Sequence, residues 1–473
     1  MKVLFVSSEI FPFSKTGGLA DMANFLPKSL ANIGYNMTVL TPYYQSITKY
    51  HQEMEYVGNK TVYFGNMQEE VHYYRIIKDN IEIIFIQNQK YFERDGFYGY
   101  DDDALRFILF SYASLEYIDL LDLPPQIIHC NDWQSATIPY LLDEHYRSKD
   151  KYKYIHTLLT IHNLEHQGIF GLDKAKYFNR SFDYTYVHFN AINYLKTGIE
   201  RATKINTVSP NYRNEIMTQK FGFTLDGALE KRANDLKGIL NGIDFDVFDP
   251  RTDALIKMNY NLNNFKSNKT VNKEDILKCF EITNKDAPLI SYIGRMAHQK
   301  GIYLMENTLE RIINETNANL VVLGTGESKY ENYFSYLQNK YPNRVGYYRG
   351  YNEKLAHEIY AASDIFLMPS LFEPCGLGQM IAMRYGSIPV VRETGGLKDT
   401  VFAYNKLDNT GTGFSFYDEN PEVFKNVLMD AINLYNNDKV KWHQLMRRAM
   451  KSDFGLEKMA KEYSDLYKKI LEG

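Results

Sequence analysis

The sequence contains 473 residues, too many for one ordinary hydrophobic core, and this length predicts about two to four domains, with two as the simplest arrangement. Hydrophobic residues make up 44% and charged residues 24% of the chain, as in folded globular proteins. The formal net charge of −4 offers no general attraction to nucleic acid or anionic lipid, so a phosphate site would need a local cluster of cations. We therefore expect neither nucleic acid nor membrane as a partner.

The cysteines and the N-terminus indicate the compartment. Three cysteines lie far apart, at Cys130, Cys279 and Cys375, in no metal-ligand spacing, which suits a reducing environment. The apolar run at residues 3–6 ends at Ser7 with no cleavage pattern after it, so we interpret it as a first strand and not as a signal peptide. No apolar stretch reaches the roughly 18 residues that a membrane span requires. These features predict a cytoplasmic protein.

Short apolar runs alternate with helical patterns through both halves of the chain. In the first half they cover residues 3–7, 37–40, 81–86, 127–130 and 158–161, and in the second half residues 289–293, 319–323, 346–348, 365–368 and 388–391. Near-continuous apolar strands alternating with helices predict parallel sheets covered on both faces. The fold class is therefore α/β, with two doubly wound, Rossmann-like domains.

We place the domain boundary near Gly242, giving one domain over residues 1–242 and a second over residues 243–454. Residues 455–473 carry Met459, Tyr463, Leu466 and Tyr467 near helical spacing, which predicts an amphipathic C-terminal helix packed on a domain. Two such domains facing a central cleft would bind ligands beyond the carboxyl ends of their strands. The loops at those ends are where we expect the chemistry.

A glycine turn follows the first predicted strand and opens a helix. Gly17 and Gly18 allow close approach of a ligand, the amides at the helix start favour an anion, and Lys15 adds a full charge. The segment fits neither the P-loop nor the G-x-G-x-x-G pattern, so a structural turn and a phosphate site both stay open.

Two cations follow a buried strand in the second half. Arg295 and Lys300 lie five positions apart, and both could reach one pyrophosphate. A planar guanidinium and a point charge together suit a diphosphate leaving group that gains negative charge as its bond to sugar breaks. The alternative is a solvated loop.

The segment at residues 369–379 is the most informative in the chain. Glu373 lies in a turn fixed by Pro374, and glycines follow as the next helix opens, so the carboxylate could accept hydrogen bonds from sugar hydroxyls. Two histidines near strand ends, His129 and His162, are further candidates, although histidines in such places are often structural.

Two acidic segments match the loose D-x-D spacing of a divalent metal site. Asp101 to Asp103 precede a helical stretch, where carboxylates cap amides, and Asp244 and Asp246 precede a turn. We favour these structural interpretations, and we expect neither a metal nor another cofactor.

Taken together, the motifs resemble the bacterial and plant glycogen and starch synthases over almost the whole chain. The resemblance rests on an ordered series: residues 15–21, 131–133, 162–164, 238–244, Arg295 with residues 299–301, residues 372–377, and residues 394–400. It implies the GT-B architecture, with the C-terminal helix crossing back to the first domain. Gln134 departs from the histidine that many relatives carry, which leaves acceptor detail open. Ile381 stands where broader relatives carry the second glutamate of Glu-x7-Glu, which favours the synthases.

The resemblance also implies roles. A catalytic set and a substrate-binding set are transferred position by position; the catalytic set is Lys15, His162, Arg295, Lys300 and Glu373. The substrate-binding set is Gly17, Gly18, Asp21, Asp132, Trp133, Asn241, Tyr351, Cys375, Gly376 and Leu377. Within these sets, Lys15, Arg295 and Lys300 would contact the donor phosphates, Tyr351 would stack on the base, and Glu373 would hold glucose hydroxyls.

The expected activity is retaining transfer of glucose from ADP-glucose to the non-reducing 4-hydroxyl of an α-1,4-glucan such as glycogen. Family membership favours ADP-glucose, because stacking on Tyr351 alone would not distinguish adenine from uracil. No carboxylate pair suited to double displacement is evident, so we expect transfer from the front face. Three alternatives are a nucleotide-sugar epimerase, a glycogen phosphorylase and a non-catalytic glucan-binding protein. The glycine turn speaks against the first, and the second would need a much longer chain and a lysine that binds pyridoxal phosphate, for which no site is recognised. The candidate residues Lys15, Arg295, Lys300 and Glu373 speak against the third.

Overall fold

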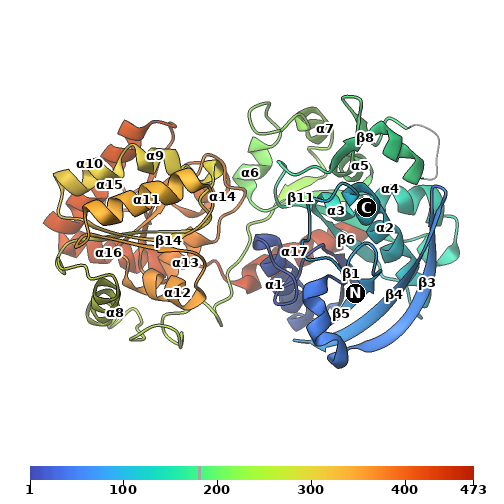
Figure 1. The fold of residues 1–473 in the computed structure, drawn as a ribbon, viewed down its shortest axis with the longest axis horizontal. Helices are drawn as coiled ribbons and strands as arrows, with labels where there is room; N and C mark the ends of the chain where they lie inside the picture. Colours follow the sequence, from blue (N-terminus) through green and yellow to red (C-terminus); the bar gives the residue numbers. More distant parts are fainter. Residues whose placement is uncertain (179–182, 473) are drawn as a thin grey trace. The chain divides into compact units, whose positions relative to one another are not determined.

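The protein, described here by a computed structural model covering residues 1–178 and 183–472, consists of two compact units (Figure 1). The first unit contains Met1–Ile239 together with the C-terminal Leu456–Gly473, and the second contains Leu240–Gly455. The chain thus leaves the first unit once, builds the second without interruption, and returns to finish in the first.

The first unit is built on a mostly parallel sheet whose strand order is β12-β11-β7-β6-β1-β2-β5-β4-β3. Its strands are β1 (Lys2–Val6), β2 (Asn36–Pro42), β3 (Glu55–Phe64), β4 (Met67–Lys78), β5 (Ile81–Gln87), β6 (Ile127–Asn131), β7 (His156–Ile161), β11 (Lys204–Thr207) and β12 (Leu236–Gly238). Only the β3–β4 and β4–β5 pairs in this sheet are antiparallel among the described residues. A small antiparallel sheet adds β8 (Ile169–Gly171), β9 (Val187–His188) and β10 (Ala191–Asn193).

Helices connect these strands. They are α1 (Gly18–Asn32), α2 (Asp103–Glu116), α3 (Asp132–Ser135), α4 (Ile138–Leu141), α5 (Tyr194–Arg201), α6 (Pro210–Glu215), α7 (Asp226–Lys231) and α17 (Leu456–Glu472). Helices α1 and α17 pack together over one region of the hydrophobic core, which also includes side chains of β1, β2 and β5.

The second unit has an all-parallel sheet in the order β15-β14-β13-β16-β17-β18. Its strands are β13 (Leu289–Ile293), β14 (Asn319–Gly324), β15 (Val345–Arg349), β16 (Ile365–Met368), β17 (Ile388–Arg392) and β18 (Phe414–Phe416). Its helices are α8 (Phe265–Cys279), α9 (Ile302–Glu306), α10 (Leu309–Glu315), α11 (Ser328–Lys340), α12 (Glu353–Ala362), α13 (Gly378–Arg384), α14 (Gly395–Thr400), α15 (Pro421–Asn437) and α16 (Lys439–Met450). Helix α11 lies on one face of this sheet, with α12 and α13 on the other (Figure 1).

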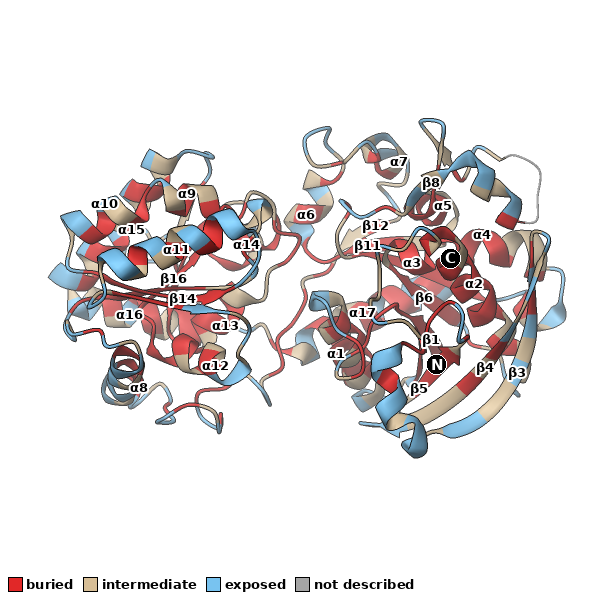
Figure 2. Ribbon diagram, in the orientation of Figure 1, coloured by how far each residue is buried: buried red, intermediate tan, exposed pale blue. Residues whose placement is uncertain are grey.

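Each parallel sheet has a switch point, at which the order of the strands reverses. The chain adds strands on one side of this point first and on the other side afterwards. In the first unit the switch lies between neighbouring strands β1 and β6, and in the second between β13 and β16. Ligands of open parallel sheets bind at the carboxyl ends of the strands beside such a switch. The central strands are buried and the covering helices expose their outer faces (Figure 2), as the continuous apolar runs predicted.

A chain of hydrogen bonds between buried side chains attaches α17 to the first sheet. Tyr467 OH lies 2.7 Å from His129 Nδ1, and the other ring nitrogen of His129 lies 2.5 Å from Thr160 Oγ1. Thr160 donates to Asn206 Oδ1 at 2.6 Å, and Asn206 donates to Tyr463 OH at 2.9 Å. His129 is therefore a structural residue that links neighbouring strands to the C-terminal helix.

The predicted α/β class, all ten predicted strands and the C-terminal helix are confirmed by these elements. The four predicted apolar positions of that helix are buried. The antiparallel pair β3 and β4 was not predicted. Its few buried residues, Val62, Phe64, Val71 and Tyr73, alternate with more exposed ones, so it lacks the continuous apolar run by which the other strands were recognised.

Candidate active site

The residues expected to carry chemistry lie where strands beside the two switch points end. In the first unit, the turn at residues 15–18 follows β1, Asp132 follows β6, and His162 follows β7. In the second unit, Arg295 follows β13 and Glu373 follows β16. Each unit therefore presents its own group of candidate residues, and we describe the two groups separately.

In the first unit, the glycines of the turn before α1 are not required by packing. A Cβ atom built on Gly17 or Gly18 meets no atom within 4 Å, and neither residue has a positive φ. Space therefore exists at the start of a 15-residue helix, where amides favour an anion. Lys15 stands beside this space and pairs with Asp21 at 2.7 Å, with 39% of its side chain exposed.

A buried carboxylate that sequence reasoning missed holds this turn. Glu9 Oε2 accepts a hydrogen bond from the Thr16 amide at 2.5 Å, and its Oε1 accepts from Thr16 Oγ1 at 2.6 Å. Tyr98 OH donates to the same Oε1 at 2.7 Å. Glu9 thus fixes Thr16, the residue between Lys15 and Gly17. Glu9 is only 3% exposed and lies far from Tyr98 in the sequence, so no local pattern indicated this role.

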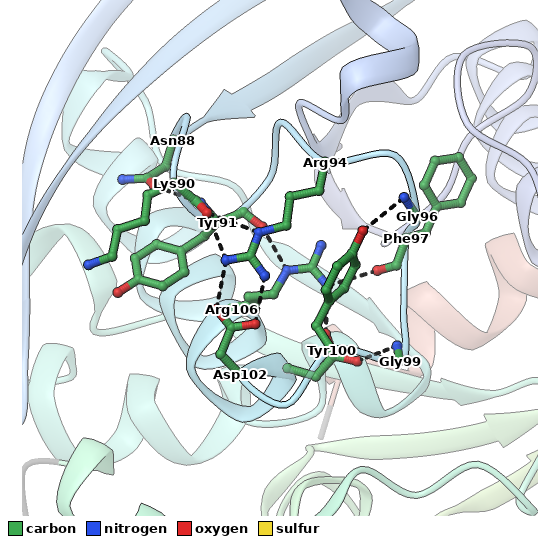
Figure 3. A network of polar contacts seen from close by, with 11 residues as sticks. Asn88, Lys90, Tyr91, Arg94, Gly96, Phe97, Gly99, Tyr100, Asp102 and Arg106 are labelled. Atoms are coloured by element: carbon green, nitrogen blue, oxygen red, sulfur yellow. Dashed lines mark hydrogen bonds and ion pairs between the residues drawn. The ribbon is translucent and has the colours of Figure 1, made fainter.

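The loop that carries Tyr98 is clamped by two arginines (Figure 3). Arg106, which is 0% exposed, donates to the carbonyls of Tyr91 and Phe97 and pairs with Asp103 at 2.5 Å. Arg94 makes two 2.7 Å bonds with Asp102. These contacts give Asp102 and Asp103, two residues of the acidic run, structural roles at the start of α2.

Asp132 combines an unusual backbone with burial. Its φ is +53°, a left-handed conformation uncommon outside glycine and strained at this position, the first residue of α3 directly after β6. Burial raises the pKa of its carboxyl to about 7, opposed by the hydrogen bonds that its oxygens accept from the amides of His162 and Asn163. A carboxyl that titrates near neutrality is a recurrent feature of functional sites.

The hydrogen bonds of Asn131 determine the tautomer of His162. The Asn131 amide nitrogen donates to the carbonyls of Val6 and His129, so its Oδ1 faces His162 Nε2 at 2.9 Å. Because an amide oxygen only accepts, Nε2 carries the proton and Nδ1 presents a lone pair. Burial lowers the pKa of His162 to about 3, so the ring is neutral at physiological pH and can accept a bond from a hydroxyl.

Trp133 lies in the interior behind Asp132 and is 8% exposed. Its ring packs edge-on against Phe107, with the centroids 4.9 Å apart, and lies so close to Gly168 that a Cβ there would come within 2.4 Å of it. The contacts of this side chain are those of a core residue that supports the Asp132 turn.

In the second unit, Lys300 and Glu373 form an ion pair of 2.7 Å between Nζ and Oε2. Ser370 donates to the same Oε2 at 2.9 Å. Among described residues, Glu373 Oε1 accepts no hydrogen bond, which leaves it for a ligand. The guanidinium of Arg295 is exposed and has no ion-pair partner in the described part of the chain.

The Glu373 loop packs tightly on glycines of the next turn. Gly395 has φ +43°, and a Cβ there would come within 1.9 Å of the Glu373 carbonyl oxygen. The amide of Gly396 donates to that oxygen at 3.1 Å. These glycines are required by close approach, so the conspicuous glycines at residues 395–396 serve to hold Glu373 in place.

The remaining predicted residues of the second unit have distinct surroundings. Asn241 is 7% exposed, and its Oδ1 is buried with no hydrogen-bond partner in the described structure, as expected of a group that awaits a ligand. Cys375 is buried, which raises the pKa of its thiol, while Gly376 and Leu377 lead into α13. Tyr351 is 77% exposed between β15 and α12.

The described residues contain no cluster of three or more histidine, cysteine, aspartate or glutamate side chains that could hold a metal ion. The second acidic pair forms a turn, in which the Asp246 amide donates to Asp244 Oδ1 at 2.8 Å. Nor does any helix in the described part of the chain have the length and apolarity to cross a membrane.

Comparison with known proteins defines the class. A family model for the starch synthase catalytic domain matches residues 2–231, and one for glycosyl transferases group 1 matches residues 275–448. Two doubly wound units that match these models in this order define a glycosyltransferase of the GT-B fold. A sucrose-phosphate synthase from Thermosynechococcus elongatus, 16% identical with a TM-score of 0.63, covers 100% of this chain and 99% of its own and shares the fold.

Two relatives and one solved structure identify the family. A glycogen synthase from Acholeplasma laidlawii is 58% identical over 474 residues, which cover 100% of this chain and 99% of the relative. One from Clostridium acetobutylicum is 42% identical over 490 residues, covering both chains fully. The catalytic domain of starch synthase IV from Arabidopsis thaliana, solved with ADP and acarbose, is 31% identical, covers 100% of this chain and 99% of its own, and has a TM-score of 0.89. The chain belongs to the glycogen and starch synthase family and is an enzyme that transfers glucose from a nucleotide sugar to a glucan.

Proposed function

We propose that the donor is ADP-glucose and that the glucosyl group passes to the non-reducing 4-hydroxyl of an α-1,4-glucan such as glycogen, with retention of configuration and release of ADP. The observation that carries this proposal is the ion pair of Lys300 with Glu373, together with the exposed guanidinium of Arg295, which has no ion-pair partner among the described residues. All three residues lie in loops that follow the strands beside a switch point. The ADP found in the starch synthase structure supports adenine as the base.

The second unit would hold the donor. Arg295 and Lys300 would bind the diphosphate and stabilise the charge that develops on it as the bond to glucose breaks. Glu373 Oε1 would accept a bond from a glucose hydroxyl, while Oε2 stays bonded to Lys300 and Ser370. The exposed ring of Tyr351 would stack on the base, and the buried Asn241 Oδ1 would bind the substrate. Residues 375–377 would lend backbone amides.

The first unit would contribute a third cation and the groups that orient the sugars. Lys15, with the amides of Gly17 and Gly18, would bind donor phosphate, and Asp21, which pairs with Lys15, would orient its ammonium group. The Nδ1 lone pair of His162 would accept a hydroxyl, and Asp132 would lie in the same sugar pocket with Trp133 behind it.

The transfer would proceed on the front face of the sugar. The bond from the anomeric carbon to the diphosphate breaks first, the cations stabilise the leaving group, and the acceptor hydroxyl attacks from the side the diphosphate leaves. The proton of that hydroxyl goes to the departing phosphate. Catalysis would then rest on positioning and charge stabilisation, with no covalent enzyme intermediate.

The direct test supplies glycogen with ADP-glucose or UDP-glucose and measures released nucleotide and labelled glucan. We expect chain growth from ADP-glucose, with product that β-amylase converts to maltose. Arg295→Ala and Lys300→Ala should each lower kcat/KM by about 10²–10³-fold. Lys329→Ala, which removes an exposed lysine paired with Glu306 in the same unit, is the matched control and should leave it unchanged.

Failure of chain growth from both donors would contradict the proposal, and faster growth from UDP-glucose would contradict its donor.

We also propose that the enzyme works in the cytoplasm, supported by three cysteines that form no disulfide. Fractionation of cells that express it, with antibody detection, tests this placement.

A further inference from the structure

One buried arginine holds the loop that carries Glu373. Arg392, the last residue of β17, is 2% exposed. Its Nε donates to the Ser370 carbonyl at 2.9 Å, and its Nη2 donates to the Leu371 carbonyl. Its Nη1 donates to the Tyr417 carbonyl at 3.2 Å. A single guanidinium thus binds two consecutive carbonyls of the loop and a third beyond β18.

The same loop is fixed from the opposite side by the segment before Lys300. The Leu371 amide donates to the Gln299 carbonyl at 2.8 Å, and Gln299 Nε2 donates to the Phe372 carbonyl at 3.2 Å. Residues 370–372 are therefore anchored both to the end of β17 and to the segment that follows β13.

Ser370 transmits this anchoring to the carboxylate. Its side chain is fully buried and donates from Oγ to Glu373 Oε2 at 2.9 Å, the oxygen that also pairs with Lys300. Because Arg392 holds the carbonyl of Ser370, it sets where that hydroxyl lies. Glu373 Oε1 is left to face a ligand.

We propose that Arg392 and Ser370 are positioning residues for glucosyl transfer, which fix the orientation of the Glu373 carboxylate without touching substrate. The inference rests on the proposed function, because it takes Glu373 as the group that holds glucose. A lysine at position 392 would keep the charge but lacks the planar fork of donors, so it would hold the two carbonyls in a different geometry. The backbone geometry, and not charge alone, is what we expect to matter.

The experiment compares steady-state kinetics of the full-length enzyme and its variants Arg392→Lys, Ser370→Ala, Glu373→Gln and the double variant of the last two. We expect Arg392→Lys to lower kcat by about 10–100-fold and to change KM for ADP-glucose by less than about threefold, since a misplaced catalytic group slows chemistry more than binding. Ser370→Ala should lower kcat by about tenfold. In the double variant, Ser370→Ala should add less than about twofold to the loss caused by Glu373→Gln.

Arg344 supplies the matched control. It precedes β15 at the opposite end of the same sheet and also donates to backbone carbonyls, those of Ile313, Thr316 and Ala318. Arg344→Lys should lower the melting temperature as Arg392→Lys does but leave kcat within about twofold of the wild type. A residue that only stabilised the fold would behave in this way.

The outcomes separate the two hypotheses. If Glu373→Gln keeps the wild-type kcat, the role proposed for Glu373 fails. If that variant loses activity while Arg392→Lys and Ser370→Ala stay within about twofold of the wild type, this inference alone is wrong. Independent, multiplicative losses from Ser370→Ala and Glu373→Gln would also overturn it. Should Arg392→Lys not fold, the Ser370 cycle still decides.

Discussion

Asp132 shows how one residue can make stability depend on pH. Burial raises the pKa of its carboxyl from 3.8 to about 7, so the folded protein keeps a proton there that the unfolded chain has released. Between about pH 4 and pH 7 the folded state therefore binds more protons, and stability falls as pH rises through this range. Above the folded pKa, the full cost of a buried charge is present.

We predict that Asp132→Asn removes this dependence, worth on the order of 4 kcal/mol across the window. Asparagine also tolerates the left-handed backbone at this position. Calorimetric unfolding at pH 5 and pH 8 should show the variant gaining stability relative to the wild type at the higher pH. Asp102→Asn is the control, because Arg94 lowers the pKa of that carboxyl and its titration lies below the window. Equal pH dependence of wild type and Asp132→Asn would refute the assignment.

A second prediction concerns the ring of His162. Burial lowers its pKa to about 3, so the neutral form persists as pH falls through 6 and 5. NMR spectra of histidine-labelled protein should show one imidazole, identified by its loss in His162→Asn, with no titration between pH 5 and pH 8. Its nitrogen shifts should indicate a proton on Nε2, as the bond to Asn131 requires. A titration midpoint inside this range would show that the ring becomes charged there.

Among single residues, the sequence predicted those whose neighbours in the chain form a recognisable local pattern. Lys15, Arg295 and Glu373 stand in glycine-rich turns after apolar runs, and the structure places all three in the loops that follow strands. The residues that support them lie in no such local pattern. Tyr98 reaches Glu9 across 89 positions and Arg392 reaches Ser370 across 22, so only the folded arrangement shows that these pairs exist.

Among the elements, α17 contributes directly to the core of its unit although it lies at the other end of the chain. Its inward side chains belong to the core of the first unit, and Tyr463 and Tyr467 end a hydrogen-bonded chain through three neighbouring strands. The direction of that chain is fixed. Thr160 donates to Asn206, so Thr160 accepts from His129 Nε2, and His129 Nδ1 must accept from Tyr467.

We therefore predict that Tyr467→Phe destabilises the first unit by about 1–3 kcal/mol, because it leaves the buried Nδ1 of His129 without a donor. Thermal unfolding of the two proteins measures the loss. The double variant with His129→Leu, which removes the stranded acceptor, should lose less than the sum of the two single variants. Additive losses would mean that this bond contributes nothing of its own.

The central, buried strands were easier to predict than the strands at the edge of a sheet. Strands buried on both faces have continuous apolar sequences, and β13 and β16 begin and end where the sequence placed them. The pair β3 and β4 alternates instead, because one face of a sheet edge meets solvent. A search for period-two alternation would have found this hairpin.

For the whole molecule, the two units differ in how the chain builds them. The second is one continuous segment with its own core, and its ends lie together: the Ile243 amide donates to the Phe454 carbonyl at 2.8 Å, in a parallel bridge beside Gly455. The first is made of two segments, and its core needs the second of them, since α17 supplies Met459, Tyr463 and Leu466.

This difference predicts opposite behaviour for the two units when the chain is cut. A fragment of residues 240–455 should fold with a cooperative transition and bind ADP, because all its strands, its core and the cations Arg295 and Lys300 are present. A fragment of residues 1–239 should be largely unfolded, because the region of its core under α17 would be exposed to water. Joining residues 456–473 to it through a short glycine linker should restore folding.

Circular dichroism and calorimetry measure the folding of all three fragments, and calorimetric titration measures ADP binding by the first. Arg295→Ala in the 240–455 fragment should weaken ADP binding without changing its melting temperature, since the guanidinium has no ion-pair partner among the described residues. A stable 1–239 fragment would show that α17 covers a core that is already complete.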